Sequence, residues 1–319
     1  MLFGKEFHYD EKQEVINLKI GLVFSGGGCL GAYEIGVWKA IKELDIDIYV
    51  QGVAGTSIGA LNAVLFALKD YKLAENIWLD LTKEKLLPID NLNLLAKGIE
   101  AFLGNKNLDF IKKHLPGLLG QGNVSRQGLM EIMNSLDVLK ALSPSMPIYA
   151  ACSALPGVDA KYFKLNDYDV ETVNKILCAT SAIPPVYGCE EIENVKYIDG
   201  GLSDNLPVRP LYEDGFNLIL AVNVDKNYKL DISSFPACKI IYIAPDFDER
   251  VSLSTILDFS KESISAHIRN GYEDTMNLLV PVFELYNFKL KKYAGGLVVN
   301  TGKNVINNIL SVFRGKTKS

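Results

Sequence analysis

The chain has 319 residues, of which 48% are hydrophobic and 22% charged, as is typical of a globular protein with a substantial core. Its net charge of -5 argues against a nucleic-acid partner, although a local basic patch that binds anionic lipid stays open. The five cysteines are odd in number and widely spaced, which excludes a disulfide framework and a zinc site of standard spacing.

The N-terminal stretch carries several charged side chains and no apolar core, so it does not read as a signal peptide. No apolar run along the chain is long enough to span a bilayer. We therefore expect a cytoplasmic protein with reduced thiols, with peripheral contact to a membrane as an open alternative.

The first quarter of the chain alternates strands with helices. A buried strand is predicted around Ile20–Phe24, followed by a glycine-rich stretch at residues 25–31 and a helix. A second strand is predicted at residues 46–50, then a glycine-containing turn, then a helix over residues 58–68. This order is typical of a parallel sheet covered by helices.

The rest of the chain continues the α/β pattern after a helical interruption. From residue 73 to about 142 no strand is convincing, and short strands are predicted at residues 146–152, 161–165 and 196–198. Helices are predicted at residues 170–179 and, as one long amphipathic helix, at 254–279. Apolar runs at residues 217–225 and 239–244 suit buried parallel strands.

No repeat or linker divides the chain, so we predict one α/β domain. Residues 1–17 would form an N-terminal segment and 18–213 the catalytic part. A leucine-rich helical insertion at about 84–125 interrupts that part. Residues 214–319 would complete the same domain. The insertion could cover an apolar cleft or touch a membrane, but ordinary helical packing explains it equally well.

The segment Gly55-Thr56-Ser57-Ile58-Gly59 matches the G-x-S-x-G nucleophile elbow, in which a serine occupies a sharp turn between a strand and a helix. Gly55 and Gly59 would let the backbone turn without Cβ clashes. The N-terminus of the following helix would favour a developing alkoxide on Ser57. By itself the pattern also fits an ordinary strand-to-helix turn.

The glycine-rich stretch Gly26–Gly28 with Gly31 satisfies G-x-G-x-x-G, a pattern that dinucleotide-binding folds also use. Those folds need an acidic residue at the end of the second strand, whereas Asp45 and Asp47 lie at its predicted start. No Lys-Ser/Thr pair follows, which excludes a P-loop. Backbone N–H groups exposed at a helix N-terminus fit an oxyanion hole better.

A serine nucleophile needs a general base, which is usually histidine. The chain has only three histidines, and none of them follows a predicted strand: His8, His114 and His267. Each fits a surface or helix-packed position, so a triad with His267 is the poorer alternative.

Asp199 is the better candidate for the base. It ends a predicted strand and precedes Gly200 and Gly201, which would place its carboxylate at the same edge of the sheet. Asp204, close by, resembles a turn or cap residue. Because a carboxylate is a weak base at its ordinary pKa, burial would have to raise the pKa of Asp199.

Taken together and in this order, the glycine-rich stretch, the elbow and Asp199-Gly200-Gly201 resemble the patatin-like phospholipase family. The segment at residues 179–184 is similar to a further family element, and the resemblance covers roughly residues 20–211. It implies a three-layer α/β/α sandwich with a mostly parallel sheet and no metal or other cofactor. The residue roles it implies are Ser57 as nucleophile, Asp199 as base, the backbone of Gly26, Gly27 and Gly28 as oxyanion hole, and Gly31, Gly55, Gly59, Gly200 and Gly201 as supporting glycines.

The resemblance further implies a serine acyl hydrolase that cleaves carboxylic esters of lipids, as a phospholipase A or lysophospholipase does. An acyltransferase with the same dyad and a non-catalytic lipid-binding protein are the alternatives. Many family members carry a basic residue where this chain has Cys29-Leu30, so a phosphate-bearing headgroup does not follow. Acyl-chain preference and oligomeric state are also left open.

Overall fold

The computed structural model describes residues 18–82, 125–142, 145–184, 186–225, 228–246 and 253–294, with the side chains of 253, 254 and 282–294 excepted. The expected N-terminal segment and all of the expected insertion but its last residue lie outside this part of the chain, as do His8 and His114.

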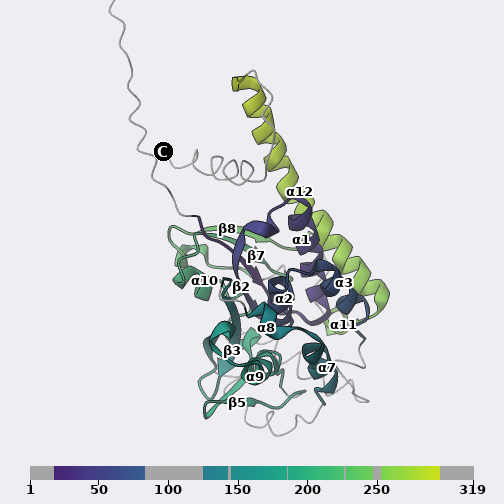
Figure 1. Ribbon diagram of the computed structural model, residues 1–319, viewed down its shortest axis with the longest axis vertical. Coiled ribbons are helices and arrows are strands. Elements are labelled where there is room, and N and C mark those ends of the chain that lie inside the picture. Colours follow the sequence, from purple (N-terminus) through teal and green to yellow (C-terminus); the bar gives the residue numbers. More distant parts are fainter. Residues whose placement is uncertain are drawn as a thin grey trace, which may run out of the picture.

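An eight-stranded mixed sheet runs through the centre of the molecule (Figure 1). Its order is β5-β6-β3-β2-β1-β7-β8, and β4 also pairs with β3. Strands β1, β2, β3, β7 and β8 are parallel, while β4, β5 and β6 run antiparallel to their partners, so the sheet is mostly parallel as predicted. The strands are β1 (Ile20–Phe24), β2 (Val50–Thr56), β3 (Ile148–Ala154), β4 (Asp159–Lys164), β5 (Glu190–Ile192), β6 (Val195–Asp199), β7 (Leu218–Val222) and β8 (Lys239–Ile243).

The helices form layers on both faces of this sheet. They are α1 (Gly31–Glu43), α2 (Ile58–Ala67), α3 (Tyr71–Leu79), α7 (Gln127–Ser135), α8 (Val138–Ala141), α9 (Val170–Thr180), α10 (Arg209–Glu213), α11 (Leu253–Ile256) and α12 (Lys261–Ala294). Alternate residues of β1 show the two faces: Leu22 and Phe24 pack with α1 and α2, whereas Val23 packs with Leu211 of α10. The fold is therefore a three-layer α/β/α sandwich, as the resemblance implied.

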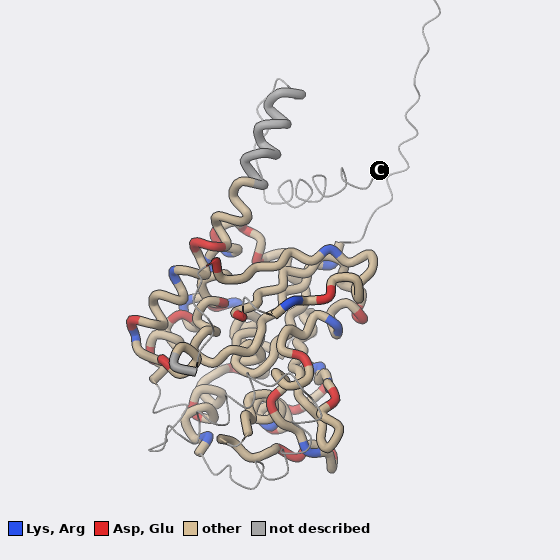
Figure 2. The backbone as a smooth tube through the Cα atoms, turned by 180° about the vertical axis from the view of Figure 1, so that it is seen from behind, with Lys and Arg blue, Asp and Glu red and all other residues tan. Residues whose placement is uncertain are grey.

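Charged residues do not gather on one side of this fold. Figure 2 shows Lys and Arg positions interspersed with Asp and Glu along the outer helices and loops of the described chain. Charges interspersed in this way form no continuous basic stripe along the described chain, the feature expected of a nucleic-acid binder.

The second strand begins later than its predicted position at residues 46–50. Residues Asp47–Tyr49 form a 3-10 turn, and β2 runs from Val50 to Thr56. The chain turns there because Asp45 adopts a φ of 55° and the Ile46 N–H bonds back to the Ile41 carbonyl at 2.7 Å. As a result the strand carries the glycine-containing segment itself into the sheet and stops directly before Ser57.

The C-terminal helix also differs from the single helix predicted over residues 254–279. It is divided into α11 and α12, and α12 continues to Ala294. Asp258 accepts the Ser260 N–H at 3.1 Å, and the Ser260 hydroxyl accepts the Ser263 N–H at 3.3 Å. These side-chain contacts satisfy the free N–H groups of a new helix start, which is why the helix breaks. Of the two late strands, β7 is fully buried and β8 only partly.

Helix α12 packs along α1, and two glycines let the helices approach closely. A Cβ on Gly36 would lie 1.9 Å from the Ile268 carbonyl oxygen, and one on Gly271 would lie 2.0 Å from the Tyr33 carbonyl oxygen. Both obstacles are backbone atoms of a packed helix, so a side chain at either position would push the helices apart.

We expect Gly36→Ala to lower the free energy of unfolding by about 1–2 kcal/mol, because overpacking at the upper end of its usual cost of about 1–3 kcal/mol outweighs the gain of roughly 1 kcal/mol in helix propensity. Urea denaturation followed by circular dichroism measures the change. A rise in stability close to the propensity gain would show that the helices separate freely and would contradict the close crossing.

Candidate active site

Ser57 occupies the one-residue turn between β2 and α2. Its backbone has a φ of 55° and a ψ of −126°, a conformation that costs a non-glycine residue about 1–3 kcal/mol. A Cβ on Gly55 would lie 2.2 Å from the Gly59 carbonyl oxygen, and one on Gly59 would lie 2.4 Å from the Ser25 carbonyl oxygen. The turn therefore needs glycine on both sides of the serine, which is the strained geometry of a nucleophile elbow.

Thr180, the last residue of α9, holds this strained backbone in place. Its hydroxyl accepts the Ser57 N–H at 2.9 Å and donates to the carbonyl oxygen of Ala151 on β3. Thr180 is fully buried. From the sequence alone Thr180 is only part of a segment similar to a family element, and no pattern assigns it a role.

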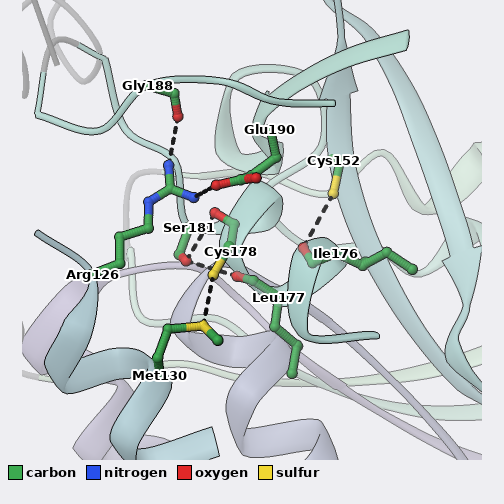
Figure 3. Close-up of polar contacts among 9 residues, drawn as sticks. All are labelled: Arg126, Met130, Cys152, Ile176, Leu177, Cys178, Ser181, Gly188 and Glu190. Atoms are coloured by element: carbon green, nitrogen blue, oxygen red, sulfur yellow. Dashed lines mark hydrogen bonds and ion pairs between the residues drawn. The ribbon is translucent and has the colours of Figure 1, made fainter. Parts of the chain in front are cut away.

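Figure 3 shows the polar contacts around the last turns of α9, the helix that ends at Thr180. The Cys152 thiol donates to the Ile176 carbonyl at 3.8 Å, and the Ser181 hydroxyl donates to the Leu177 carbonyl at 2.8 Å. Arg126, at the start of α7, donates to the Gly188 carbonyl and pairs with Glu190 on β5. The end of α9 is thus tied to β3, while Arg126 ties the start of α7 to the loop that leads into β5 and β6.

We expect Thr180→Val to lower kcat by about 10-fold or more while KM stays nearly constant, because the Ser57 N–H loses its acceptor and a buried unpaired donor costs about 1–3 kcal/mol. Thr180→Ser keeps the hydroxyl and serves as the matched control. Steady-state kinetics of both variants decide the matter. If Thr180→Ser, which loses only the methyl group, falls as far as Thr180→Val, the effect does not come from the hydroxyl and its proposed role is contradicted.

Asp199 reaches the elbow because β2 and β6 share one edge of β3. Thr56 at the end of β2 pairs with Ala151, and Asp199 at the end of β6 pairs with the next residue, Cys152. Strand β4 takes the opposite edge of β3 along the same residues. The carboxyl ends of β2 and β6 therefore meet head to head, and a Cβ on Gly200 would lie 3.0 Å from Thr56 Cγ2.

The carboxyl group of Asp199 is buried, with 2% of the residue exposed. Its Oδ1 accepts the Gly201 N–H at 2.7 Å, and Oδ2 is buried without a hydrogen bond of standard geometry to any described residue. Burial raises the pKa of Asp199 to about 7, against the opposing effects of the Gly201 N–H and the Ser57 hydroxyl. The buried carboxylate is therefore a much stronger base than an exposed aspartate, with the serine hydroxyl as its neighbour.

Two competing residues have other partners. Asp204 accepts the Tyr162 hydroxyl at 2.7 Å and the Leu206 N–H at 3.2 Å, which is the turn chemistry expected from the sequence. His267 is buried in α12. It lies near Asp258, whose pKa is lowered mainly by a hydrogen bond with Ser260 and to a smaller degree by His267. Their contacts give neither residue a role as base for Ser57.

The glycine-rich loop runs beside the serine. A Cβ on Gly26 would lie 3.2 Å from Ser57 Cβ, and one on Gly27 would lie 2.3 Å from Val224 Cγ2. Gly28 has a φ of 57°, a left-handed conformation that favours glycine. The loop therefore approaches Ser57 through backbone atoms.

One of the three expected oxyanion donors is already in use. The Gly26 N–H donates to the Asn205 carbonyl at 3.2 Å, so the expectation that Gly26 contributes to an oxyanion hole is corrected. The N–H groups of Gly27 and Gly28 have no acceptor among the residues that the structure describes. Of the three expected donors, these two are left free to bind an oxyanion.

Asn205 connects the segment that follows Asp199 to the glycine-rich loop. Its side-chain amide donates to the Gly26 carbonyl at 3.1 Å, while its own carbonyl accepts the Gly26 N–H. No sequence pattern singles out Asn205, so this double contact was not predicted. The Ser57 side chain, the buried Asp199 carboxyl and the glycine-rich loop thus lie next to one another, an arrangement that acyl transfer through a serine would require. In the described part of the chain no cluster of His, Cys, Asp or Glu could hold a metal ion.

Comparison with known proteins gives the same picture. A family model described as patatin-like phospholipase matches residues 22–212. Lysophospholipase nte1 of Aspergillus terreus is 50% identical over 65 residues, which are 20% of this chain and 4% of that protein. An uncharacterised NTE family protein of Mycobacterium tuberculosis is 25% identical over 207 residues, 65% of this chain and 49% of that protein.

Among solved structures, VipD from Legionella pneumophila matches with a TM-score of 0.45 and 14% identity over 93% of this chain and 74% of that one. The type III effector ExoU matches with a TM-score of 0.36 and 16% identity over 93% of this chain and 62% of that one. This chain spans at most about half the length of the curated relatives that it matches.

Proposed function

Because the chain belongs to the patatin-like phospholipase family, we propose that it hydrolyses carboxylic esters of lipids through an acyl-enzyme on Ser57, with Asp199 as base. Lipid acyl hydrolysis is the activity that the family and the named lysophospholipase relative indicate. The observation that carries the residue roles is the head-to-head meeting of β2 and β6 on β3, which sets the strained serine beside a buried carboxylate.

In the proposed first half-reaction, the Ser57 oxygen attacks the ester carbonyl carbon and Asp199 takes the hydroxyl proton. The carbonyl oxygen becomes an oxyanion that accepts hydrogen bonds from the Gly27 and Gly28 N–H groups. Each such donor typically lowers the barrier by about 3–4 kcal/mol. Collapse of the intermediate breaks the ester bond, and the leaving alcohol takes the proton from Asp199.

The second half-reaction repeats these steps with water. Asp199 removes a proton from the water, whose oxygen attacks the acyl carbon, and the same N–H groups stabilise the oxyanion. Collapse releases the fatty acid and returns the proton to Ser57. Because accepting a proton makes Asp199 neutral, its burial favours the proton transfer in both halves.

The glycine-rich loop offers no cation for a lipid headgroup. Cys29, which stands where many family members carry a basic residue, is buried, and its thiol donates to the Asp258 carbonyl at 2.7 Å. We therefore propose lipid acyl esters as the substrate class and specify no headgroup. Lysophospholipids and phospholipids are the first substrates to assay.

Contact with a membrane surface is also a proposal, since such substrates reside there. No helix in the described ranges is both long and apolar enough to cross a bilayer. Co-sedimentation of the protein with phosphatidylcholine vesicles tests peripheral binding, and a protein that stays in the supernatant would count against it.

A fluorophosphonate probe followed by mass-spectrometric site mapping tests the function, together with fatty-acid release from a medium-chain acyl ester. We expect the label on Ser57 and free fatty acid as product. Acyl transfer to added glycerol at the expense of fatty acid would identify an acyltransferase instead. Label on a different serine, or none at all, would overturn the proposed nucleophile.

A further inference from the structure

A fully buried carboxyl group lies next to the glycine-rich loop, and the proposed reaction does not use it. Glu34, in the first turn of α1, has no exposed surface. Its Oε2 accepts the Asn62 side-chain amide at 2.7 Å, and its Oε1 accepts the Ser25 hydroxyl at 3.5 Å. No cation pairs with it among the described residues. A buried carboxyl without a cation is costly, so its place next to the loop needs a reason.

Both partners of Glu34 bind the ends of the loop. Ser25 directly precedes Gly26, and its hydroxyl also accepts the Val224 N–H at 3.0 Å at the end of β7. Asn62 donates a second hydrogen bond to the carbonyl oxygen of Gly31 at 3.0 Å, where the loop enters α1. The network therefore reaches the loop at its first and its last residue.

Asn62 also links the network to the nucleophile. It lies in α2, one turn after the helix begins at Ile58, the residue that follows Ser57. Its side-chain oxygen accepts the Trp78 indole N–H at 2.8 Å, so all of its hydrogen-bonding atoms have partners. Because both the nitrogen and the oxygen of the amide are hydrogen-bonded, Asn62 fixes Glu34 and Gly31 relative to α2.

The surroundings of Glu34 also make its carboxyl group harder to ionise. Burial raises its pKa well above the ordinary value, while hydrogen bonds from Asn62 and Ser25 oppose that rise. A carboxyl that is harder to ionise puts less negative charge beside the loop, where the proposed reaction builds up an oxyanion. An ionised carboxylate there would repel that oxyanion.

We propose that Glu34 is a positioning residue that sets the distance between the loop N–H donors and the Ser57 oxygen through Ser25 and Asn62. The proposal rests on the proposed serine-hydrolase function. An error of about 1 Å in the placement of reacting groups can cost roughly 100-fold in rate. Glu34 itself touches no reacting atom, so its effect must appear in kcat rather than in substrate binding.

Glu34→Ala and Glu34→Gln test this role in the full chain with a medium-chain acyl ester. We expect Glu34→Ala to lower kcat and the rate of fluorophosphonate labelling by about 100-fold, with KM changed by less than about threefold. Glu34→Gln is neutral and can hydrogen-bond to both Asn62 and Ser25, so it should stay within about threefold of wild type. If the negative charge of Glu34 were required, Glu34→Gln would lose as much kcat as Glu34→Ala.

Tyr33→Phe is the matched control, because it alters the neighbouring residue of α1 and removes only a hydrogen bond to Asp274 on α12. It should leave kcat unchanged. If Glu34→Ala does not fold, Ser25→Ala detaches the same loop end and should lower kcat in the same way. A folded Glu34→Ala or Ser25→Ala with wild-type kcat, or a Glu34→Gln as slow as Glu34→Ala, overturns the proposal. A wild type that neither labels at Ser57 nor releases fatty acid would instead overturn the proposed function.

Discussion

Ser57→Ala is expected to lower kcat for ester hydrolysis by about 10⁵- to 10⁶-fold, because no other group can form the acyl-enzyme. The residual rate should come from the oxyanion donors and from binding alone. Fatty-acid release measured by mass spectrometry has the range to detect such a loss. The variant should also fail to react with a fluorophosphonate.

Ser135→Ala provides the control for this experiment. Ser135 is exposed at the end of α7, and its hydroxyl bonds only within its own helix, to the Ile132 carbonyl at 2.6 Å. Its loss should change neither labelling nor turnover. An intact rate for Ser57→Ala would remove the acyl-enzyme mechanism altogether.

The elbow could be predicted from the sequence because its requirements are local. Gly55 and Gly59 are needed to avoid clashes with backbone atoms within four residues or on the adjoining strand β1. Strands β1 and β7 could also be predicted from the sequence, because they are fully buried and therefore apolar throughout.

The strand that leads into the elbow was harder to place. Val50–Thr56 contains two glycines and an exposed glutamine, a composition more typical of a turn than of a central strand. Only pairing with β1 on one side and β3 on the other makes it a strand. Strand β5 was not predicted for a related reason. Two of its three residues are glutamates, and it is a strand only because it pairs with β6 in a hairpin.

The contacts that position the site could not be predicted, because they join distant parts of the chain. Thr180 meets Ser57 and Asn205 meets Gly26 across more than a hundred residues, and no spacing rule connects them. The double contact of Asn205 also explains why counting exposed glycines overestimates the oxyanion hole. Whether an N–H group is free depends on the fold around it rather than on the glycine that carries it.

Asp199→Asn is the second change with a large expected effect, a loss of about 10⁴-fold in kcat, since the amide cannot accept the serine proton. In the wild type the base must be ionised, so log(kcat/KM) should rise with unit slope below pH 7 and level off above it, following the raised pKa of about 7. The residual kcat/KM of Asp199→Asn should not show this rise with pH. A wild-type profile that is flat between pH 5 and 8 would exclude Asp199 as the base.

The same raised pKa predicts that Asp199→Asn stabilises the fold at alkaline pH. In the unfolded chain an aspartate ionises near pH 4, whereas the buried Asp199 holds its proton up to about pH 7. Its contribution to stability is thus full below pH 4 and is lost as the pH rises to 7, by up to roughly 4 kcal/mol. The neutral asparagine escapes this loss, so the melting temperature of the variant relative to wild type should rise between pH 5 and 8. A difference independent of pH would mean that Asp199 is ionised in the folded protein at all these values, and that its carboxylate is not a poised base.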